Sequence, residues 1–214
     1  VRLDVTTAGR GRPVPAGLAQ SVPGTLTMIV LMMTMIYGGI FLAIEKRSGL
    51  LRRQMGLPIG RGGLIAGTLG GRLLVAGVQI VVLLLAGRLI FDVDFGASPA
   101  GLALLLTTYA FSVAGLATFF GAVFRTPEQA AATGWVTSMV MAAMGGCWWP
   151  GEIVPRWLWH AAHIFPTTWA MDAFHALISF GRGIEGVVLP AAVLLGFGLV
   201  FSALGARLLD PAGA

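Results

Sequence analysis

Charged residues and cysteine are scarce in this chain, and each scarcity excludes a class of protein. Of the 214 residues only 11% are charged while 57% are hydrophobic, and the mean hydropathy is +0.86. Soluble domains have about 25% charged residues, and a disordered chain is poor in apolar side chains. The single cysteine, Cys147, excludes an internal disulfide and a cysteine-rich metal site. The composition predicts an integral membrane protein.

Lysine and intramembrane acids are also nearly absent. The only lysine, Lys46, is followed by Arg47, so the phosphate-binding sequence G-x-x-x-x-G-K-[ST] cannot occur. If the protein uses ATP, another chain must hydrolyse it. The long apolar stretches hold essentially no acid, which argues against a carrier driven by protons or sodium.

Long uncharged stretches predict an all-α polytopic membrane protein with five spans. A spanning helix needs about 20 apolar residues, and barrel strands are shorter and alternate. The predicted spans are residues 25–44, 67–91, 99–122, 130–147 and 187–207. A further run, Trp157–Met171, is short for a span and predicts a re-entrant or interfacial segment. The chain opens without methionine, and we expect a sixth span before residue 1.

The charges between the spans predict the orientation. The net charge is +5, but the basic residues lie between apolar stretches, which favours topology over nucleic-acid binding. The loop 45–61 is strongly basic, and residues 92–94 read Asp-Val-Asp. By the positive-inside rule the first loop is cytoplasmic and the second external. The resulting division is an external segment 1–24, a transmembrane domain 25–208 and a cytoplasmic tail 209–214.

The loop 45–61 is the most informative polar segment. Apolar residues alternate with its charges, which is typical of a short amphipathic helix on the inner surface. One interpretation is topogenic charge attracted to lipid headgroups; the other is a docking surface for a cytoplasmic partner. The residues that would form this surface are Glu45, Lys46, Arg47, Gly49, Arg52 and Arg53. For Glu45 we expect a cation of the partner, or Arg52 or Arg53, as its counterion.

Small and polar residues predict contacts between helices. Gly63, Gly67 and Gly71 repeat at every fourth position, which predicts close helix packing on one face. Gln79, in the middle of a predicted span, predicts an interhelical hydrogen bond rather than a substrate contact.

Glycine, proline and tryptophan gather after the fourth predicted span. Trp148 and Trp149 fit an aromatic belt at the outer surface, but the whole segment 152–185 is too apolar for a solvated loop, which predicts short helices dipping into the membrane. The residues proposed for this outer gate are Gly145, Gly146, Trp148, Trp149, Pro150 and Pro155. Three histidines and an aspartate follow in this segment: His160, His163, Asp172 and His175. Their spacing matches no zinc motif, so we favour histidines at the membrane interface over a metal site.

Several of these residues occur in a familiar order. The pattern is Gln20-x-x-Pro23-Gly24, Glu45-Lys46-Arg47-x-Gly49-x-x-Arg52-Arg53, Gly71-Arg72-Leu73 with Gln79, Gln129, Gly145-Gly146-x-Trp148-Trp149-Pro150, Pro155 and Pro166-x-x-Trp169-Ala170. Over roughly residues 20–208 the chain resembles the membrane subunit, or permease, of ABC-2-type ABC transporters. No single motif is decisive, but their order and placement relative to the spans are specific.

The resemblance implies a function and its partners. A permease of this family has six spans, pairs with a second permease as a homo- or heterodimer, and is served by a separate ATP-binding cassette subunit that binds ATP and Mg. The chain itself would bind no cofactor, no metal and no nucleic acid. The loop 45–61 would couple to the ATPase, and the protein would export a drug- or lipid-like substrate across the cytoplasmic membrane. The alternatives are a secondary transporter and a non-transport membrane scaffold.

Overall fold

The described part of the chain is helical throughout, with no strand among its residues. The computed structural model describes residue 15 and residues 17–50, 61–96 and 98–209. The helices are α1 (Leu18–Arg47), α3 (Arg61–Leu89), α4 (Pro99–Val123), α5 (Pro127–Met144), α6 (Arg156–Ala162), α7 (Pro166–Ile178) and α8 (Glu185–Leu208), with a 3-10 turn, η1, at Gly151–Ile153. The all-α prediction is confirmed.

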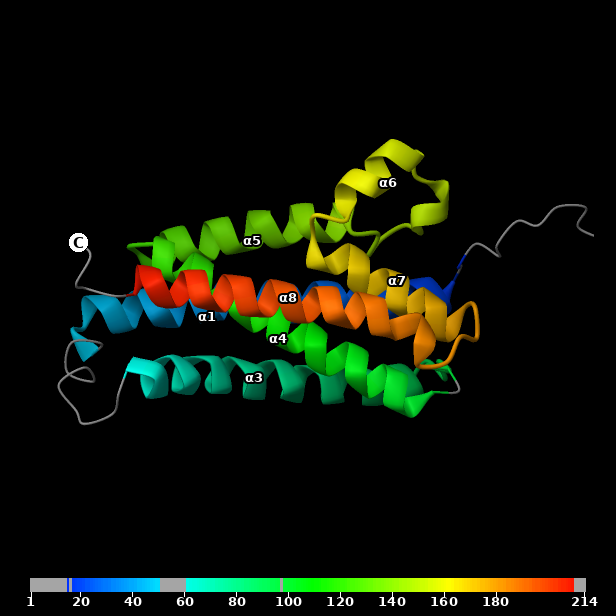
Figure 1. Ribbon diagram of the computed structural model, residues 1–214, viewed down its shortest axis with the longest axis horizontal. Coiled ribbons are helices and arrows are strands. Elements are labelled where there is room, and N and C mark those ends of the chain that lie inside the picture. Colours follow the sequence, from blue (N-terminus) through cyan, green and yellow to red (C-terminus); the bar gives the residue numbers. More distant parts are fainter. Residues whose placement is uncertain (1–14, 16, 51–60, 97, 210–214) are drawn as a thin grey trace, which may run out of the picture.

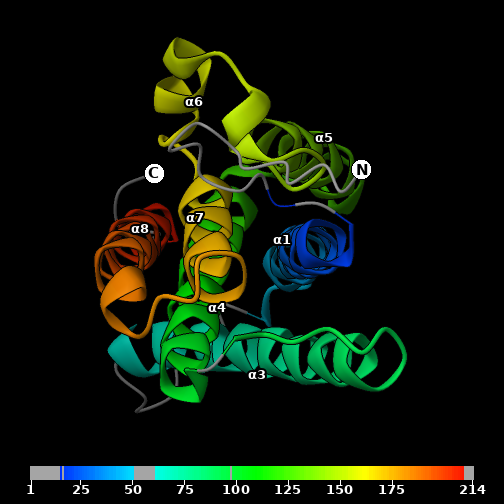
Figure 2. The same ribbon diagram turned by 90° about the vertical axis from the view of Figure 1, so that its right-hand side faces the viewer.

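The long helices run along the long axis of the molecule around a central α4. Helices α1, α3, α7 and α8 all pack against α4, and α5 lies beside α1 (Figures 1 and 2). The largest fully buried side chains include Tyr109 of α4 and Phe174 of α7, and the Tyr109 hydroxyl donates to the Thr27 carbonyl at 2.7 Å. Helix α4 is the most buried of the long apolar helices, with 67% of its apolar window buried in the bundle.

The two ends of the bundle have different structures. At one end, called the loop end here, α1, α4 and α8 finish and α3 and α5 begin; at the other end lie α6 and α7 (Figure 1). Positive-φ glycines end two helices: Gly49 follows α1 with φ 70°, and Gly146 follows α5 with φ 78°. At both positions glycine avoids the steric cost that a Cβ would add.

The prediction of five spans is wrong by one. Among the described residues, four helices are long and apolar enough to cross a membrane: Leu18–Arg47, Ala66–Leu89, Pro99–Val123 and Glu185–Leu208. The predicted span 130–147 corresponds to α5, which has only 18 residues because Gly145 ends it. Helix α5 also carries Glu128, Gln129 and three hydroxyl residues, which lower its hydropathy. Helix α5 is therefore absent from this apolar set, although it packs beside α1 and runs from the loop end toward the other end of the bundle (Figure 1).

Two other boundaries also differ from the sequence-based ones. Helix α1 begins at Leu18, so the segment 1–24 does not end where the first helix begins. The predicted re-entrant run Trp157–Met171 is divided between α6 and α7, with Pro166 starting the second helix. Most side chains of α7 are buried in the bundle, whereas Trp157 of α6 is 73% exposed. The prediction of short helices is correct, but only α6 projects from the bundle.

Candidate coupling end and outer gate

Lys46 fastens the end of α1 to the end of α4. Its Nζ donates to the carbonyl of Gly121 at 2.9 Å, to that of Phe124 at 3.3 Å, and to that of Ala122. The last carbonyls of a helix have no partner within the helix and carry its partial negative charge, so an ammonium group satisfies both needs. Lys46 therefore ties the end of α1 to the end of the central helix α4.

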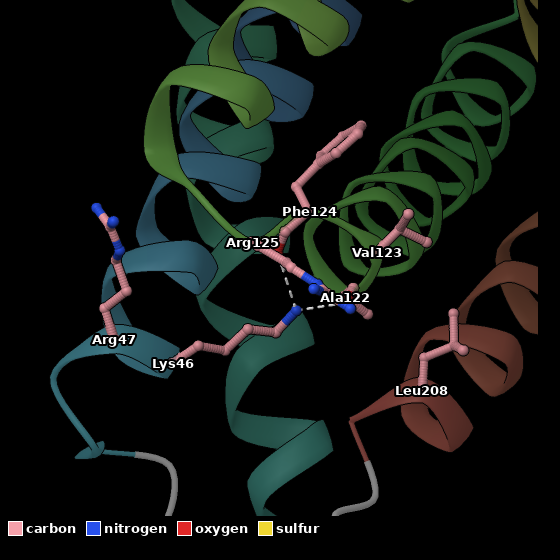
Figure 3. A pocket seen from close by; sticks show the side chains of 7 residues that line it. All are labelled: Lys46, Arg47, Ala122, Val123, Phe124, Arg125 and Leu208. Atoms are coloured by element: carbon pink, nitrogen blue, oxygen red, sulfur yellow. Dashed lines mark hydrogen bonds between the residues drawn. The ribbon is translucent and has the colours of Figure 1, made fainter. Parts of the chain in front are cut away.

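A basic pocket opens beside this contact. It has a volume of about 510 Å3 and is lined from three helix ends (Figure 3). The lining residues are Lys46 and Arg47 of α1, Leu208 of α8, Ala122 and Val123 of α4, and Phe124 and Arg125 of the turn between α4 and α5. Three of these seven side chains are cationic. Such a positively charged surface attracts an acidic partner. The same charges would be unfavourable inside the apolar core of a membrane.

The predicted coupling residues separate into distinct places. Lys46 and Arg47 line the basic pocket, and Gly49 terminates α1. Arg52 and Arg53 lie outside the described residues. Glu45 does not line this pocket; it lies in a groove between α1 and α3 together with Arg72. From the sequence, Arg125 was predicted only to lie in a cytoplasmic loop. Its place in the pocket could not be predicted, because only the fold brings the turn between α4 and α5 beside the end of α1.

We expect the Lys46→Met variant to be less stable than the wild type. Methionine keeps the apolar stem of lysine but removes every donor to the end of α4. A charge that caps a partly buried helix end contributes up to about 2 kcal/mol. At about 2–4 °C per kcal/mol, the melting temperature of the purified protein should fall by about 4–8 °C. The exposed neighbour Arg47, changed to Met, is the control and should shift it by less than about 2 °C. Equal shifts would contradict the capping role.

At the other end, the predicted gate glycines are joined to α1 and α7. Gln20 of α1 donates from Nε2 to the Gly146 carbonyl at 2.8 Å, and its Oε1 lies 2.6 Å from His175 Nε2. All three residues are buried. A Cβ at Gly145 would lie 2.1 Å from Thr167 Oγ1, so glycine lets the end of α5 meet the start of α7. These contacts close this end of the bundle.

The remaining gate residues lie around this closure. Trp148 and Trp149 form an edge-to-face pair with ring centroids 5.7 Å apart, and both remain at least 40% exposed. Pro150 and Pro155 stand at the N-caps of η1 and α6. The structure thus brings the six predicted gate residues into one region, which the missed contact partners Gln20 and Thr167 hold in place.

The histidines do not form one cluster. His163 Nε2 lies 2.9 Å from Asp172 Oδ2, and its Nδ1 lies 2.8 Å from the Trp159 carbonyl. His175 points instead to Gln20, and His160 is exposed. Within the described ranges no group of three or more potential ligands could hold a metal ion. His163 and Asp172 brace α6 against α7.

Two predicted helix contacts are not made within the described part of this chain. Gly63, Gly67 and Gly71 are exposed, and a Cβ at Gly67 or Gly71 would meet nothing within 4 Å, so these glycines do not pack against another helix of the described chain. Gln79 Oε1 is buried but has no hydrogen-bond partner in the described part of the chain, so this oxygen does not make the predicted interhelical bond. Helix α3 lies at the edge of the bundle, where only one face meets other helices (Figure 2).

These features define a polytopic helical membrane protein whose two ends are closed differently. The sequence profile described as "ABC-2 family transporter protein" matches residues 6–207, and the chain belongs to this family of transporter permeases. It is similar to the linearmycin resistance permease protein LnrN of Bacillus subtilis (strain 168), with 25% identity over 183 residues. The alignment covers 86% of this chain and 47% of that protein, so the chain spans about half the length of this curated relative. No solved structure matches the chain.

Proposed function

We propose that this chain is the membrane subunit of an ATP-binding cassette exporter in the cytoplasmic membrane. A separate subunit binds ATP and Mg and hydrolyses the nucleotide, two permeases pair as a homo- or heterodimer, and a drug- or lipid-like substrate is moved outward. The family supports the transporter subunit, and the name of the relative, a resistance permease, supports export of a harmful compound. The chain's own part is to bind the partner and to change conformation.

The basic pocket at the loop end is the observation that supports coupling best. Arg47 and Arg125 present positive charge where a cytoplasmic partner would bind, and Lys46 ties this surface to α4. Helix α4 also packs against α7. A displacement that the partner imposes on Arg47 would therefore be passed along packed helices to α7 beside the gate. Coupling between distant sites uses such continuous chains of packed elements.

The described spans contain little that a secondary transporter would use. Such a carrier needs ionisable side chains within its spans to bind the driving ion. In the described spans Arg72 is the buried charged side chain, and it binds a backbone carbonyl and a hydroxyl of neighbouring helices. The chain's own residues thus favour an external energy source.

The direct test uses the full-length protein. It should co-purify with an ATP-binding cassette subunit, and vesicles containing both should export a hydrophobic cationic dye when ATP is supplied. A second arm replaces ATP by a proton gradient, which should drive no export. Transport driven by the gradient in the absence of the ATPase would establish the secondary transporter instead. Failure of any cassette ATPase to co-purify would overturn the proposed coupling.

A further inference from the structure

A groove between α1 and α3 takes no part in the proposed coupling or in the outer gate. It has a volume of about 280 Å3 and is lined by one face of each helix, spaced at three- and four-residue intervals. Its lining from α1 is Met33, Thr34, Tyr37, Gly38, Phe41, Leu42 and Glu45, and from α3 it is Gly67, Thr68, Gly71, Arg72 and Val75. The walls are apolar apart from a few polar groups, and the groove is open on the outer side because Tyr37 and Phe41 are more than half exposed.

Arg72 is the first of these polar groups. Its side chain is only 8% exposed, and Nη2 donates to the Gly38 carbonyl at 2.8 Å while Nη1 donates to Thr118 Oγ1. A guanidinium has five N–H donors, so these two contacts orient the group and leave donors for a ligand in the groove. A planar guanidinium held in this way is suited to bind a phosphate.

Glu45 and Thr34 are two further polar groups of the groove, which Tyr37 and Thr68 also line. Glu45 lines the same groove, and its carboxylate acts electrostatically on Arg72, yet no ion pair within 4.0 Å joins these two described residues. The hydroxyl of Thr34 is buried and has no hydrogen-bond partner in the described ranges. The groove therefore presents an anionic group, a cationic group and an unsatisfied hydroxyl, with space between them.

The order of these groups along the groove matches one class of molecule. Glu45 lies at the loop end, Arg72 lies deeper opposite Gly38, and Thr34 lies one turn deeper still; from Glu45 to Thr34 the helix rises about 16 Å. A phospholipid has its ammonium group outermost, then its phosphate, then its ester oxygens and acyl chains. Glu45, Arg72 and Thr34 are placed to meet these groups in that order, with Met33 and Val75 beside the acyl chain.

From this match we infer that the α1–α3 groove binds a phospholipid with a zwitterionic primary-amine headgroup, such as phosphatidylethanolamine, from the leaflet at the loop end. A transmembrane helix is a poorer occupant, because it would have to bring both an acidic and a basic side chain into the apolar layer. The glycines Gly67 and Gly71 now have a role, since their missing side chains leave room for the lipid. The site requires only that the chain spans a membrane, so it does not depend on the proposed coupling.

Two adjacent glycines provide a matched test. A Cβ at Gly71 or at Gly70 would meet nothing within 4 Å, so either can be enlarged without a clash inside the protein, but only Gly71 lines the groove. The purified full-length permease is placed in mild detergent with phosphatidylethanolamine, and retained lipid is counted by native mass spectrometry. The Gly71→Leu variant should lose the bound lipid and Gly70→Leu should keep it. Equal retention by both variants would overturn the site.

The headgroup is tested with lipids of identical acyl chains. Phosphatidylethanolamine should bind better than phosphatidylcholine, whose quaternary ammonium cannot donate to Glu45, and better than phosphatidylglycerol, which has no cation. Arg72→Gln should weaken phosphatidylethanolamine binding about tenfold, as expected for one lost charge-assisted hydrogen bond. Glu45→Gln should reduce the preference over phosphatidylcholine. Preferential binding of phosphatidylglycerol, or a loss of permease dimers in Gly71→Leu without loss of lipid, would overturn the proposal and indicate an anionic lipid or a protein in the groove.

Discussion

The Gly24→Ala variant is expected to be the most destabilised glycine-to-alanine variant among the described glycines, by about 3 kcal/mol or more, at the upper end of the range for overpacking. A Cβ at Gly24 would lie 1.9 Å from the Cys147 carbonyl oxygen and 2.8 Å from its carbonyl carbon. These are backbone atoms in the turn after α5, so they cannot rotate away as a flexible side chain would. Helix α1 would have to move off the gate region.

The control for this prediction is Gly70→Ala, where the new methyl group meets nothing within 4 Å. Because alanine is favoured over glycine in a helix interior by about 1 kcal/mol, this variant should be at least as stable as the wild type. Thermal unfolding of both purified variants, followed by loss of the monodisperse size-exclusion peak, distinguishes them. A Gly24→Ala protein that unfolds at or above the wild-type temperature would show that α1 does not approach the turn after α5 so closely.

The second large effect is expected at the loop end, where charge reversal should abolish partner binding. Arg47 and Arg125 lie on different helices but line one pocket. If an acidic surface of the ATPase binds there, the double variant Arg47→Glu, Arg125→Glu places like charges opposite each other, which costs several kcal/mol. We expect binding weaker by at least about 100-fold, since every 1.4 kcal/mol corresponds to a factor of ten, and no ATP-driven export.

The matched control changes an exposed arginine at the opposite end, Arg156→Glu on α6. This variant should bind the ATPase as the wild type does, measured by co-purification at low and at moderate salt. Wild-type binding should itself weaken as salt rises, because exposed charges are screened. If both variants bind equally well, the basic pocket is not the docking surface, although a coupling role of the loop 45–61 would still be open to a separate test.

Much of the gate could be predicted from the sequence because its residues are close along the chain. Glycine and proline after the fourth apolar stretch have local conformational consequences, and Gly146, Pro150 and Pro155 indeed stand at a turn and at two helix starts. The buried partners of this segment could not be predicted. Gln20 and Gly146 are 126 residues apart, and nothing in either sequence context indicates that they meet.

The glycine repeat of α3 illustrates the opposite failure. Its four-residue spacing correctly places Gly67 and Gly71 on one helix face, but spacing cannot say what that face meets. In the fold α3 lies at the edge of the bundle. The face with Gly67 and Gly71 lines the groove that contains Arg72 and does not pack against another helix of the described chain. The sequence suggests that Arg72 lies at a membrane edge with its side chain extended toward water, whereas in the fold it is buried and α1 and α4 supply its hydrogen-bond acceptors.

Composition and the length of the uncharged stretches by themselves determined that this protein is an all-helical membrane protein, because spanning a membrane requires long runs of side chains that prefer lipid to water. The tertiary structure alone decided which charges act together. Lys46 caps α4, Arg47 meets Arg125 in one pocket, and Glu45 turns to the groove of Arg72. Neighbours in sequence point in different directions on a helix, so only the packing of α1 against α3 and α4 could assign them to separate sites.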